Sequence, residues 1–387
     1  MGRYDLIIVY RSFWPVYPVI GEGLLQVAES FASKKKVAVI LQDHANINKQ
    51  LKEFKRGAGV NFFPIRAFSN SSHSLVIRVI DSIFFMIWVF FYLIKTRPKN
   101  IYVSTDPPVL VPFIIALFSK ITNCKYIYHL QDIHPEASNI FIKMNKILFN
   151  LLKKVDNFTM RHAKLLITLN EEMKIEIINR LKTQKEIAIV QNPSVPININ
   201  LSIQKKRGFS FTGNLGRFQR VPLLINAINQ YKKEGGCLEF IFAGGGIYSD
   251  EIFKLSKNNA LVTHYGLVSS DQAVSISIER EWALLPIEDE ITRFAFPSKI
   301  FSYVNSGAKI LAICGENTTV AKWIQSNRVG IVIVPTLDRI VESFFNIEKH
   351  NINFSSINLD QKEIKKNLHM NEFVKNIKKI IFPEYNV

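Results

Sequence analysis

The feature that most constrains this chain is a regular alternation of short β-branched runs with longer stretches of helical period. This alternation is typical of parallel sheets covered by helices, because each parallel strand needs a crossover before the next. In the first half we expect strands at 5–9, 37–41, 60–65, 101–104, 126–130, 165–169 and 187–190. In the second half we expect strands at 209–212, 238–243, 262–265, 282–286, 309–313 and 330–334.

One segment interrupts the alternation, QNPSVPININ at 191–200, where prolines and asparagines oppose regular structure. The length of 387 residues also exceeds what a single hydrophobic core usually supports. We therefore predict an α/β protein of two Rossmann-like domains, residues 1–192 and 193–370, that face a cleft. Residues 371–387 are predicted to form a helix that packs back on the N-terminal domain or on the second one.

The charge of the chain favours an anionic partner. Its formal net charge is +17, but the basic pairs and triplets are scattered along the sequence instead of massed on one arm or helix. This argues against nucleic acid as the partner.

The three cysteines are far apart and have no Cys-x-x-Cys spacing, so we expect neither a disulfide nor a metal. The apolar run of MGRYDLIIVY is too short for a secretory signal, which favours the cytoplasm.

The most apolar segment of the chain is SLVIRVIDSIFFMIWVFFYLIK, residues 74–95. Only residues 82–94 are free of charge, and as a helix they cover about 20 Å against about 30 Å of bilayer hydrocarbon. We interpret the segment as a core helix that does not span a membrane. The alternative is a helix that lies on a membrane surface, since the segment is rich in aromatic residues and has basic surroundings.

Several glycine-containing loops follow predicted strands. GEGLLQVAESF at 21–31 places Gly21 and Gly23 before an amphipathic helix, although a simple turn explains this pattern equally well. FTGNLGRFQR at 211–220 and FIFAGGG at 240–246 end two strands of the second domain. Ligands of open α/β sheets bind beyond the carboxyl ends of strands, so these loops predict a nucleotide-phosphate site.

Lys299 stands at the front of a helix predicted from SKIFSYVNSG, where the positive end of the backbone dipole disfavours a cation. One interpretation is an ordinary solvated lysine. The other is a lysine that shares the helix end with an anion. Arg217, Gln219 and Arg220 cluster at the loop 213–220, where an anion would meet charge-assisted hydrogen bonds.

The order of these motifs resembles the glycosyltransferases of family 4, and most of all the subgroup that builds bacterial surface polysaccharides such as O-antigen and capsule. The resemblance is carried by GEGLLQVAESFASKKKVAVI, STDPPVL, YHLQDIHPEA, FTGNLGRFQRVPLLINAI, IFAGGG, FPSKIFSYVNSGAKILA and AKWIQSNRVGIVI. It implies the two-domain GT-B fold. It also implies retaining, metal-independent transfer of a sugar from a nucleotide sugar, with a UDP-sugar favoured, to a polyprenyl-linked glycan at the inner face of the membrane. No cofactor is implied, because the nucleotide sugar is a substrate.

The loops and the resemblance together give two sets of expected site residues. The expected donor-binding residues are Gly21, Gly23, Asn214, Arg217, Gln219, Arg220, Gly244, Gly245, Tyr265, Pro297, Ser298, Lys299 and Ser302. The expected catalytic residues on the acceptor side are Asp132, His134 and Glu136, which follow a predicted strand as a dense polar group. The alternative for that group is a helix start capped by Asp132 with Pro135 in the first turn.

The chain departs from the family pattern at two positions. Many relatives carry glutamates where this sequence has Phe294 and Ser302, and the second of these glutamates binds ribose hydroxyls. Ser302 therefore puts the ribose contact in doubt. Two other functions remain open from the sequence: a nucleotide-sugar 2-epimerase of the same fold, and a basic module that binds membranes or nucleic acid.

Overall fold

The computed structural model describes residues 3–17, 19–69, 74–194, 204–350, 357 and 362–385. The chain divides into two compact units, Met1–Pro193 with Met370–Val387, and Ser194–His369. These boundaries lie one residue from the predicted ones at each end of the second unit. Of the segment predicted as a linker, residues 195–200 lie outside the described residues.

The first unit is built on a seven-stranded parallel sheet with the order β3-β2-β1-β4-β5-β6-β7. All seven strands predicted for the first half are present. Their bounds are β1 Leu6–Ser12, β2 Val37–Asp43, β3 Asn61–Arg66, β4 Asn100–Ser104, β5 Lys125–His129, β6 Leu165–Thr168 and β7 Ile187–Ile189. The order reverses at β1, so β1, β4 and β5 place their carboxyl ends side by side.

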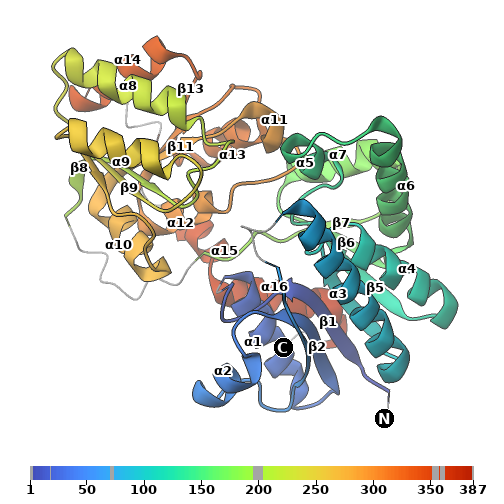
Figure 1. Ribbon diagram of the computed structural model, residues 1–387. Helices are drawn as coiled ribbons and strands as arrows, with labels where there is room; N and C mark the ends of the chain where they lie inside the picture. Colours follow the sequence, from blue (N-terminus) through green and yellow to red (C-terminus); the bar gives the residue numbers. More distant parts are fainter. Residues whose placement is uncertain are drawn as a thin grey trace. The chain divides into compact units, whose positions relative to one another are not determined.

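Helices cover this sheet in a way that follows from the right-handed crossovers of parallel strands. Their bounds are α1 Ile20–Ala32, α2 Ile47–Glu53, α3 Leu75–Thr96, α4 Leu110–Thr122, α5 Glu136–Phe141, α6 Lys146–His162, α7 Glu171–Leu181 and α16 Met370–Ile381. Helix α4 lies between α3 and α6 on one face, whereas α16 packs against α1 (Figure 1). The last helix of the chain therefore belongs to the first unit.

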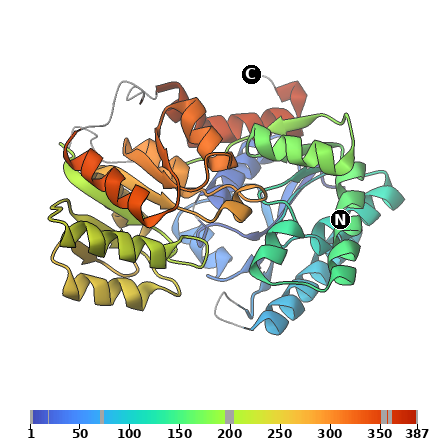
Figure 2. The same ribbon diagram turned by 90° about the horizontal axis from the view of Figure 1, so that it is seen from above.

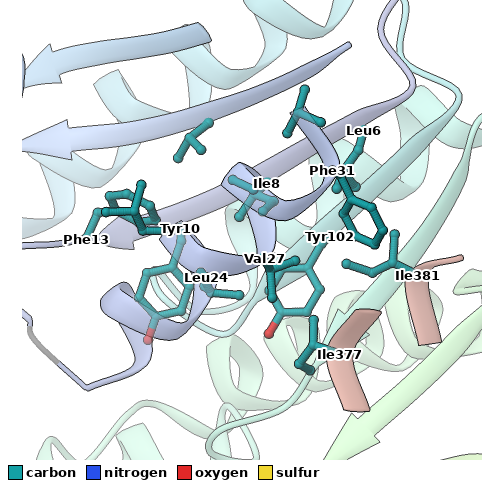
Figure 3. Close-up of a cluster of buried hydrophobic side chains, with 14 of the residues drawn as sticks. Leu6, Ile8, Tyr10, Phe13, Leu24, Val27, Phe31, Tyr102, Ile377 and Ile381 are labelled. Atoms are coloured by element: carbon teal, nitrogen blue, oxygen red, sulfur yellow. The ribbon is translucent and has the colours of Figure 1, made fainter. Parts of the chain in front are cut away.

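The core between α1, α16 and the sheet explains why α16 returns to the first unit. Val27 and Phe31 of α1 and Ile377 and Ile381 of α16 lie together against β1 (Figure 3). These side chains are almost completely buried. Their spacing of four residues places each pair on one helix face, so α16 buries a continuous apolar stripe here.

Helix α3 is more exposed than the sequence suggested. It has 22 residues and is long and apolar enough to cross a membrane by length and composition. Asp81, Phe85, Val89 and Leu93 form a buried stripe, while most of the other apolar side chains of α3 are exposed. The expectation of a core helix is therefore wrong, because only one face of α3 packs on the protein.

The second unit has a six-stranded parallel sheet with the order β10-β9-β8-β11-β12-β13, and all six predicted strands are present. Their bounds are β8 Lys206–Thr212, β9 Phe240–Ala243, β10 Val262–His264, β11 Arg280–Pro286, β12 Lys309–Ile313 and β13 Gly330–Ile333. The main helices are α8 Val221–Lys233, α9 Ser249–Asn258, α10 Ser270–Glu279, α11 Asp289–Thr292, α12 Lys299–Ser306, α13 Thr319–Asn327, α14 Leu337–Glu348 and α15 Lys362–Asn367. Helices α9, α8 and α14 lie side by side (Figures 1 and 2), and α10 packs against α12.

Candidate functional site

Three loops at the carboxyl edge of the second sheet are hydrogen-bonded to one another. The Gly213 N–H donates to Ala243 O at 2.8 Å, and the Leu215 N–H donates to Gly245 O at 2.8 Å. The Gly244 N–H donates to Gly266 O at 2.7 Å. The loops that follow β8, β9 and β10 therefore form one backbone layer, as expected where neighbouring parallel strands end together.

The glycines of this layer are required by its close packing. Gly244 has a φ of +139°, and a Cβ there would lie 1.9 Å from Gly213 O. Gly246 has a φ of +149°, and its Cβ would lie 2.5 Å from Leu215 O. Only glycine fits both the backbone conformation and the space. Any larger residue would push the β8 and β9 loops apart.

Helix α12 begins at Lys299, as the sequence predicted, and it is joined to the same loops. The Thr212 N–H donates to the buried Tyr303 hydroxyl at 3.1 Å, which ties α12 to the end of β8. The helix ends at Gly307 in the left-handed region with a φ of +72°. Ser298 precedes the helix and makes no side-chain cap, so the first N–H groups of α12 have no capping acceptor from that residue.

The Lys299 ammonium lies beside the glycine layer and is buried. Its Nζ is 4.0 Å from the centre of the Phe211 ring and 3.7 Å from the position that a Cβ of Gly213 would take. Among the residues that the structure describes, no hydrogen-bond partner reaches this Nζ. Burial lowers the pKa of Lys299 to about 7. An unpaired buried cation is unfavourable, so this position favours an anion that would pair with it.

Polar side chains of the β8 loop surround Gly216. The Gly216 N–H donates to Gln219 Oε1 at 2.9 Å. A Cβ on Gly216 would lie 2.7 Å from Asn214 Nδ2, so Asn214 and Gln219 bracket this glycine. Arg217 is exposed at the same loop. These three expected residues therefore lie on the same loop as Gly213, which is next to Lys299.

Arg220 was expected among the phosphate ligands, but it is engaged elsewhere. Its guanidinium lies 2.9 Å from Asp289 and 3.0 Å from Glu288, and its Nε donates to Ile287 O at 2.8 Å. These contacts join the start of α8 to the segment after β11. Arg220 is thus neutralised by two carboxylates, and its geometry indicates a structural role in shaping the loop.

The remaining expected donor-binding residues are Tyr265, Pro297, Ser298 and Ser302. Tyr265 and Leu267 follow β10 and are 56% and 86% exposed, which is unusual for large apolar side chains that lie beside a glycine loop. Pro297 and Ser298 precede α12. Ser302 is half-buried and lies three residues after Lys299, which places both on the same face of the helix.

No protein-family model matches this chain. A curated relative is the probable glycosyltransferase WbjE of Pseudomonas aeruginosa, 22% identical over 251 residues, which are 61% of this chain and 62% of that protein. The chain thus spans less than two thirds of the length of this relative.

Solved structures match over nearly the whole chain. The lipopolysaccharide outer core galactosyltransferase WaaB is 15% identical, with a TM-score of 0.65 over 99% of this chain and 100% of that one. Anabaena HepE, solved in complex with UDP, is 14% identical, with a TM-score of 0.64 over 97% of this chain and 99% of that one. The chain has the GT-B fold. This fold and the relative named as a probable glycosyltransferase confirm the resemblance that the motifs indicated.

Gly21 and Gly23 do not lie in a loop before the helix. Both lie inside the first turns of α1, and the Gly23 N–H is already hydrogen-bonded to Val19 O. A Cβ on Gly23 would lie 2.6 Å from the Phe373 ring of α16, and a Cβ on Gly21 would lie 2.6 Å from the backbone nitrogen of Trp14. These two glycines therefore allow close packing of α1, and the expectation of a loop before the helix is wrong. The role expected for them in donor binding stays a prediction.

A second polar cluster lies where β1, β4 and β5 of the first unit end. Asp106 accepts from the Ser12 N–H at 3.0 Å and lies 3.6 Å from the Arg11 guanidinium. The Asp132 N–H donates to the Thr105 hydroxyl at 3.4 Å, which brings the β4 and β5 loops together. Burial, with the negative charge of Asp106, raises the pKa of Asp132 to about 6. Asp132 is half-buried and suited to accept a proton near neutral pH.

His134 and Glu136 are held by other groups. His134 Nδ1 is 2.8 Å from the Ser138 hydroxyl, and burial, with the charge of Arg180, lowers its pKa to about 4. Glu136 pairs with Lys153 at 2.8 Å and with Arg180 at 2.9 Å. A doubly paired carboxylate does not serve as a free base. The expectation that Glu136 orients acceptor hydroxyls or a sugar stays a prediction. Asp132 does not cap α5 either, because that helix begins after Pro135.

Sequence reasoning missed Arg11, Asp106, Arg180 and Tyr303. Asp106 lies in the motif STDPPVL, which was noted only for its resemblance. Arg11 directly follows the apolar part of β1. A charged residue at the end of a buried strand was the available signal for both. Arg180 and Tyr303 act through contacts with residues far away in the sequence, and no local pattern marks them.

Proposed function

We propose that the protein is a glycosyltransferase that moves a sugar from a nucleotide sugar, with a UDP-sugar favoured, to a lipid-linked glycan acceptor. The observation that carries the proposal is the buried Lys299 ammonium, which has no hydrogen-bond partner among the described residues and lies beside glycine-containing loops in a chain of GT-B fold. An anionic diphosphate is the complement of such a cation. The relative named as a probable glycosyltransferase supports the same class of activity.

In this proposal the reaction places growing negative charge on the leaving diphosphate. Lys299 lies where it can pair with that charge, and the positive end of the α12 backbone dipole adds to it. Arg217 provides a further cation at the edge of the loops. The exposed Tyr265 and Leu267 offer apolar surface for a flat base. The transfer proceeds with retention at the anomeric carbon and without a metal.

The acceptor side of the reaction is assigned to the carboxyl edge of the first sheet. Asp132, with a raised pKa, is the residue proposed to accept the proton of the acceptor hydroxyl. Asp106 and Arg11 position the surrounding loops. The acceptor is a polyprenyl-linked intermediate of surface polysaccharide biosynthesis, and the protein acts in the cytoplasm at the inner face of the membrane.

The proposal is tested with a panel of nucleotide sugars and a lipid extract that contains the acceptor, in the presence and absence of EDTA. We expect transfer from one nucleotide sugar with undiminished rate in EDTA, and we expect that nucleotide sugar to bind in calorimetry. Interconversion of a nucleotide sugar without any acceptor would identify an epimerase instead. Absence of both turnover and nucleotide binding would refute the proposal.

A further inference from the structure

The outer surface of three neighbouring helices, α3, α4 and α6, combines exposed apolar side chains with an unusual absence of acidic ones. On α3 these side chains recur at the spacing of one helix face. The exposed large apolar residues are Val76, Ile77, Val79, Ile80, Ile83, Phe84, Ile87, Phe90, Phe91 and Ile94 of α3, Ile121 of α4, and Ile147, Leu148 and Leu151 of α6. Their exposure ranges from 38% to 83%. We call the exposed side of these helices the α3–α6 surface.

The charges on this surface have one sign. Asp81 and Asp156 are the acidic residues in the sequences of the three helices, and both are buried. Basic residues are exposed on all three helices. They are Arg78 and Lys95 of α3, Lys120 of α4, and Lys146, Lys154 and Arg161 of α6. A soluble surface normally mixes both signs, so this arrangement favours a partner with dense negative charge.

Helix α3 is fixed to the protein along its inner side, which excludes a transmembrane orientation in this fold. Asp81 accepts hydrogen bonds from Gln42 at 2.9 Å and from the Ser69 hydroxyl at 2.6 Å. The Trp88 indole donates to Phe63 O at 3.1 Å. Crossing a bilayer would break these bonds and expose Asp81 to hydrocarbon. The helix is therefore held flat on the first unit with its apolar outer side free.

We propose that the α3–α6 surface docks on an anionic lipid bilayer, with α3 lying in the plane of the interface. Apolar side chains enter the boundary of the acyl chains, and the surrounding lysines and arginines meet the negative headgroups. A second copy of this chain is a poorer occupant. A symmetric dimer through this surface would bring cations against cations, with no exposed carboxylate from the three helices to pair with them. This proposal deepens the proposed function by naming the face that meets the membrane of the lipid-linked acceptor.

The test is flotation of the full chain with vesicles of pure phosphatidylcholine and with vesicles that also contain phosphatidylglycerol. The variant Phe84→Glu/Ile87→Glu places two carboxylates on positions of α3 that are 52% and 57% exposed. Phe84 also contacts the Phe68 ring, so circular dichroism and thermal unfolding check that the variant keeps the fold. The control Ile175→Glu/Phe253→Glu makes the same change on α7 and α9, whose residues Ile175 and Phe253 are 54% and 51% exposed.

We expect the wild type and the control to float with the anionic vesicles, and we expect the Phe84→Glu/Ile87→Glu variant to bind at least about tenfold more weakly. Salt at high concentration weakens wild-type binding. Equal vesicle binding by the Phe84→Glu/Ile87→Glu variant and the control would overturn the proposal. Failure of the wild type to float with the anionic vesicles would also overturn it. Self-association in sedimentation that only the α3 variant abolishes would assign the surface to a second copy instead.

The vesicle experiment contains no nucleotide, so its failure is separable from failure of the proposed function. Calorimetry with the nucleotide sugar in lipid-free buffer reports on the second unit alone. If nucleotide binding persists while vesicle binding is absent, only the membrane surface is wrong. If vesicle binding persists without nucleotide binding, the surface stands and the enzyme assignment falls.

Discussion

Two buried cations, one in each unit, differ in how they are paired. Arg180 of the first unit contacts Glu136 and Asp156 at 2.9 Å each, and it donates to Asn157 Oδ1 at 2.7 Å. Lys299 of the second unit has no such partner within the described residues. A buried cation that pairs with carboxylates of the protein itself stabilises the fold. A buried cation without such a partner is better suited to bind an anion.

Because Arg180 pairs with two buried carboxylates, we expect Arg180→Met to have the largest effect of the substitutions, a loss of stability. Removing the guanidinium leaves Glu136 and Asp156 buried without its charge, which should lower the free energy of unfolding by about 3–5 kcal/mol. Denaturant unfolding measures this value. Lys164→Met, at an exposed position of the same unit, should change it by less than about 0.5 kcal/mol. Equal effects of the two substitutions would contradict the role assigned to Arg180.

The second prediction concerns Lys299→Met, which removes the ammonium and keeps an unbranched side chain. Affinity for the nucleotide sugar should fall between about 10-fold and 100-fold, as for the loss of a hydrogen bond to a charged group. The free energy of unfolding at neutral pH should stay the same or rise, because a poorly solvated group is lost. Calorimetry and denaturant unfolding measure both quantities.

The exposed Lys254 of α9 offers a matched control in the same unit. Lys254→Ala should leave nucleotide affinity and stability nearly unchanged. If Lys299→Met lowered the free energy of unfolding as much as Arg180→Met, Lys299 would also stabilise the fold. The difference drawn between the two cations would then be wrong.

The third prediction is a proton uptake on binding. Free Lys299 has a pKa of about 7, and a bound diphosphate raises that pKa because it favours the charged form. At pH 8 the free lysine is mostly neutral, so binding of a nucleotide sugar should take up about one proton. At pH 6 it is already protonated, and uptake should be close to zero. Affinity should therefore decrease as the pH rises above 7, by up to about tenfold per pH unit.

Titrations in buffers of different ionisation enthalpy measure this uptake directly. The Lys299→Met variant serves as the control, since it should show no uptake at pH 8. Uptake that persists in that variant would assign the proton to another group and remove this difference between the two cations.

The smallest expected effect is at Ser302, on the same face of α12 as Lys299. Ser302→Ala removes one neutral hydroxyl, so nucleotide-sugar affinity should fall by no more than about tenfold, and by less than for Lys299→Met. Binding assays with the nucleotide sugar measure the change. A loss as large as that of Lys299→Met would show that the hydroxyl, and not only the cation, determines affinity at this helix.

Much of the fold was predictable from the sequence because its signals are local. Every predicted strand is present, since β-branched runs between helical stretches identify buried parallel strands without tertiary information. The start of α12 at Lys299 and its end at Gly307 were likewise predictable from the residues around them. The loops with Gly213 and Gly244 were placed correctly because they directly follow strands of one sheet.

The pairing of charged residues was not predictable in the same way. Glu136 and Arg220 look like site residues in the sequence, because a charged group after a strand is a common feature of ligand sites. Their partners Arg180 and Asp289 lie 44 and 69 residues away. Which charge is neutralised by the protein, and which is left for a ligand, therefore depends on contacts that only the folded chain makes.

The sequence by itself determined the two α/β units, the order of their strands along the chain and the position of Lys299 at a helix start. These depend on hydrophobic period, glycine and proline, which act over a few residues. Only the tertiary structure decided that the Lys299 ammonium is buried with no hydrogen-bond partner from the described part of the chain, that Gly23 packs on α16, and that α3 keeps an exposed apolar side. Burial and pairing are set by neighbours distant in the sequence, and local pattern does not contain them.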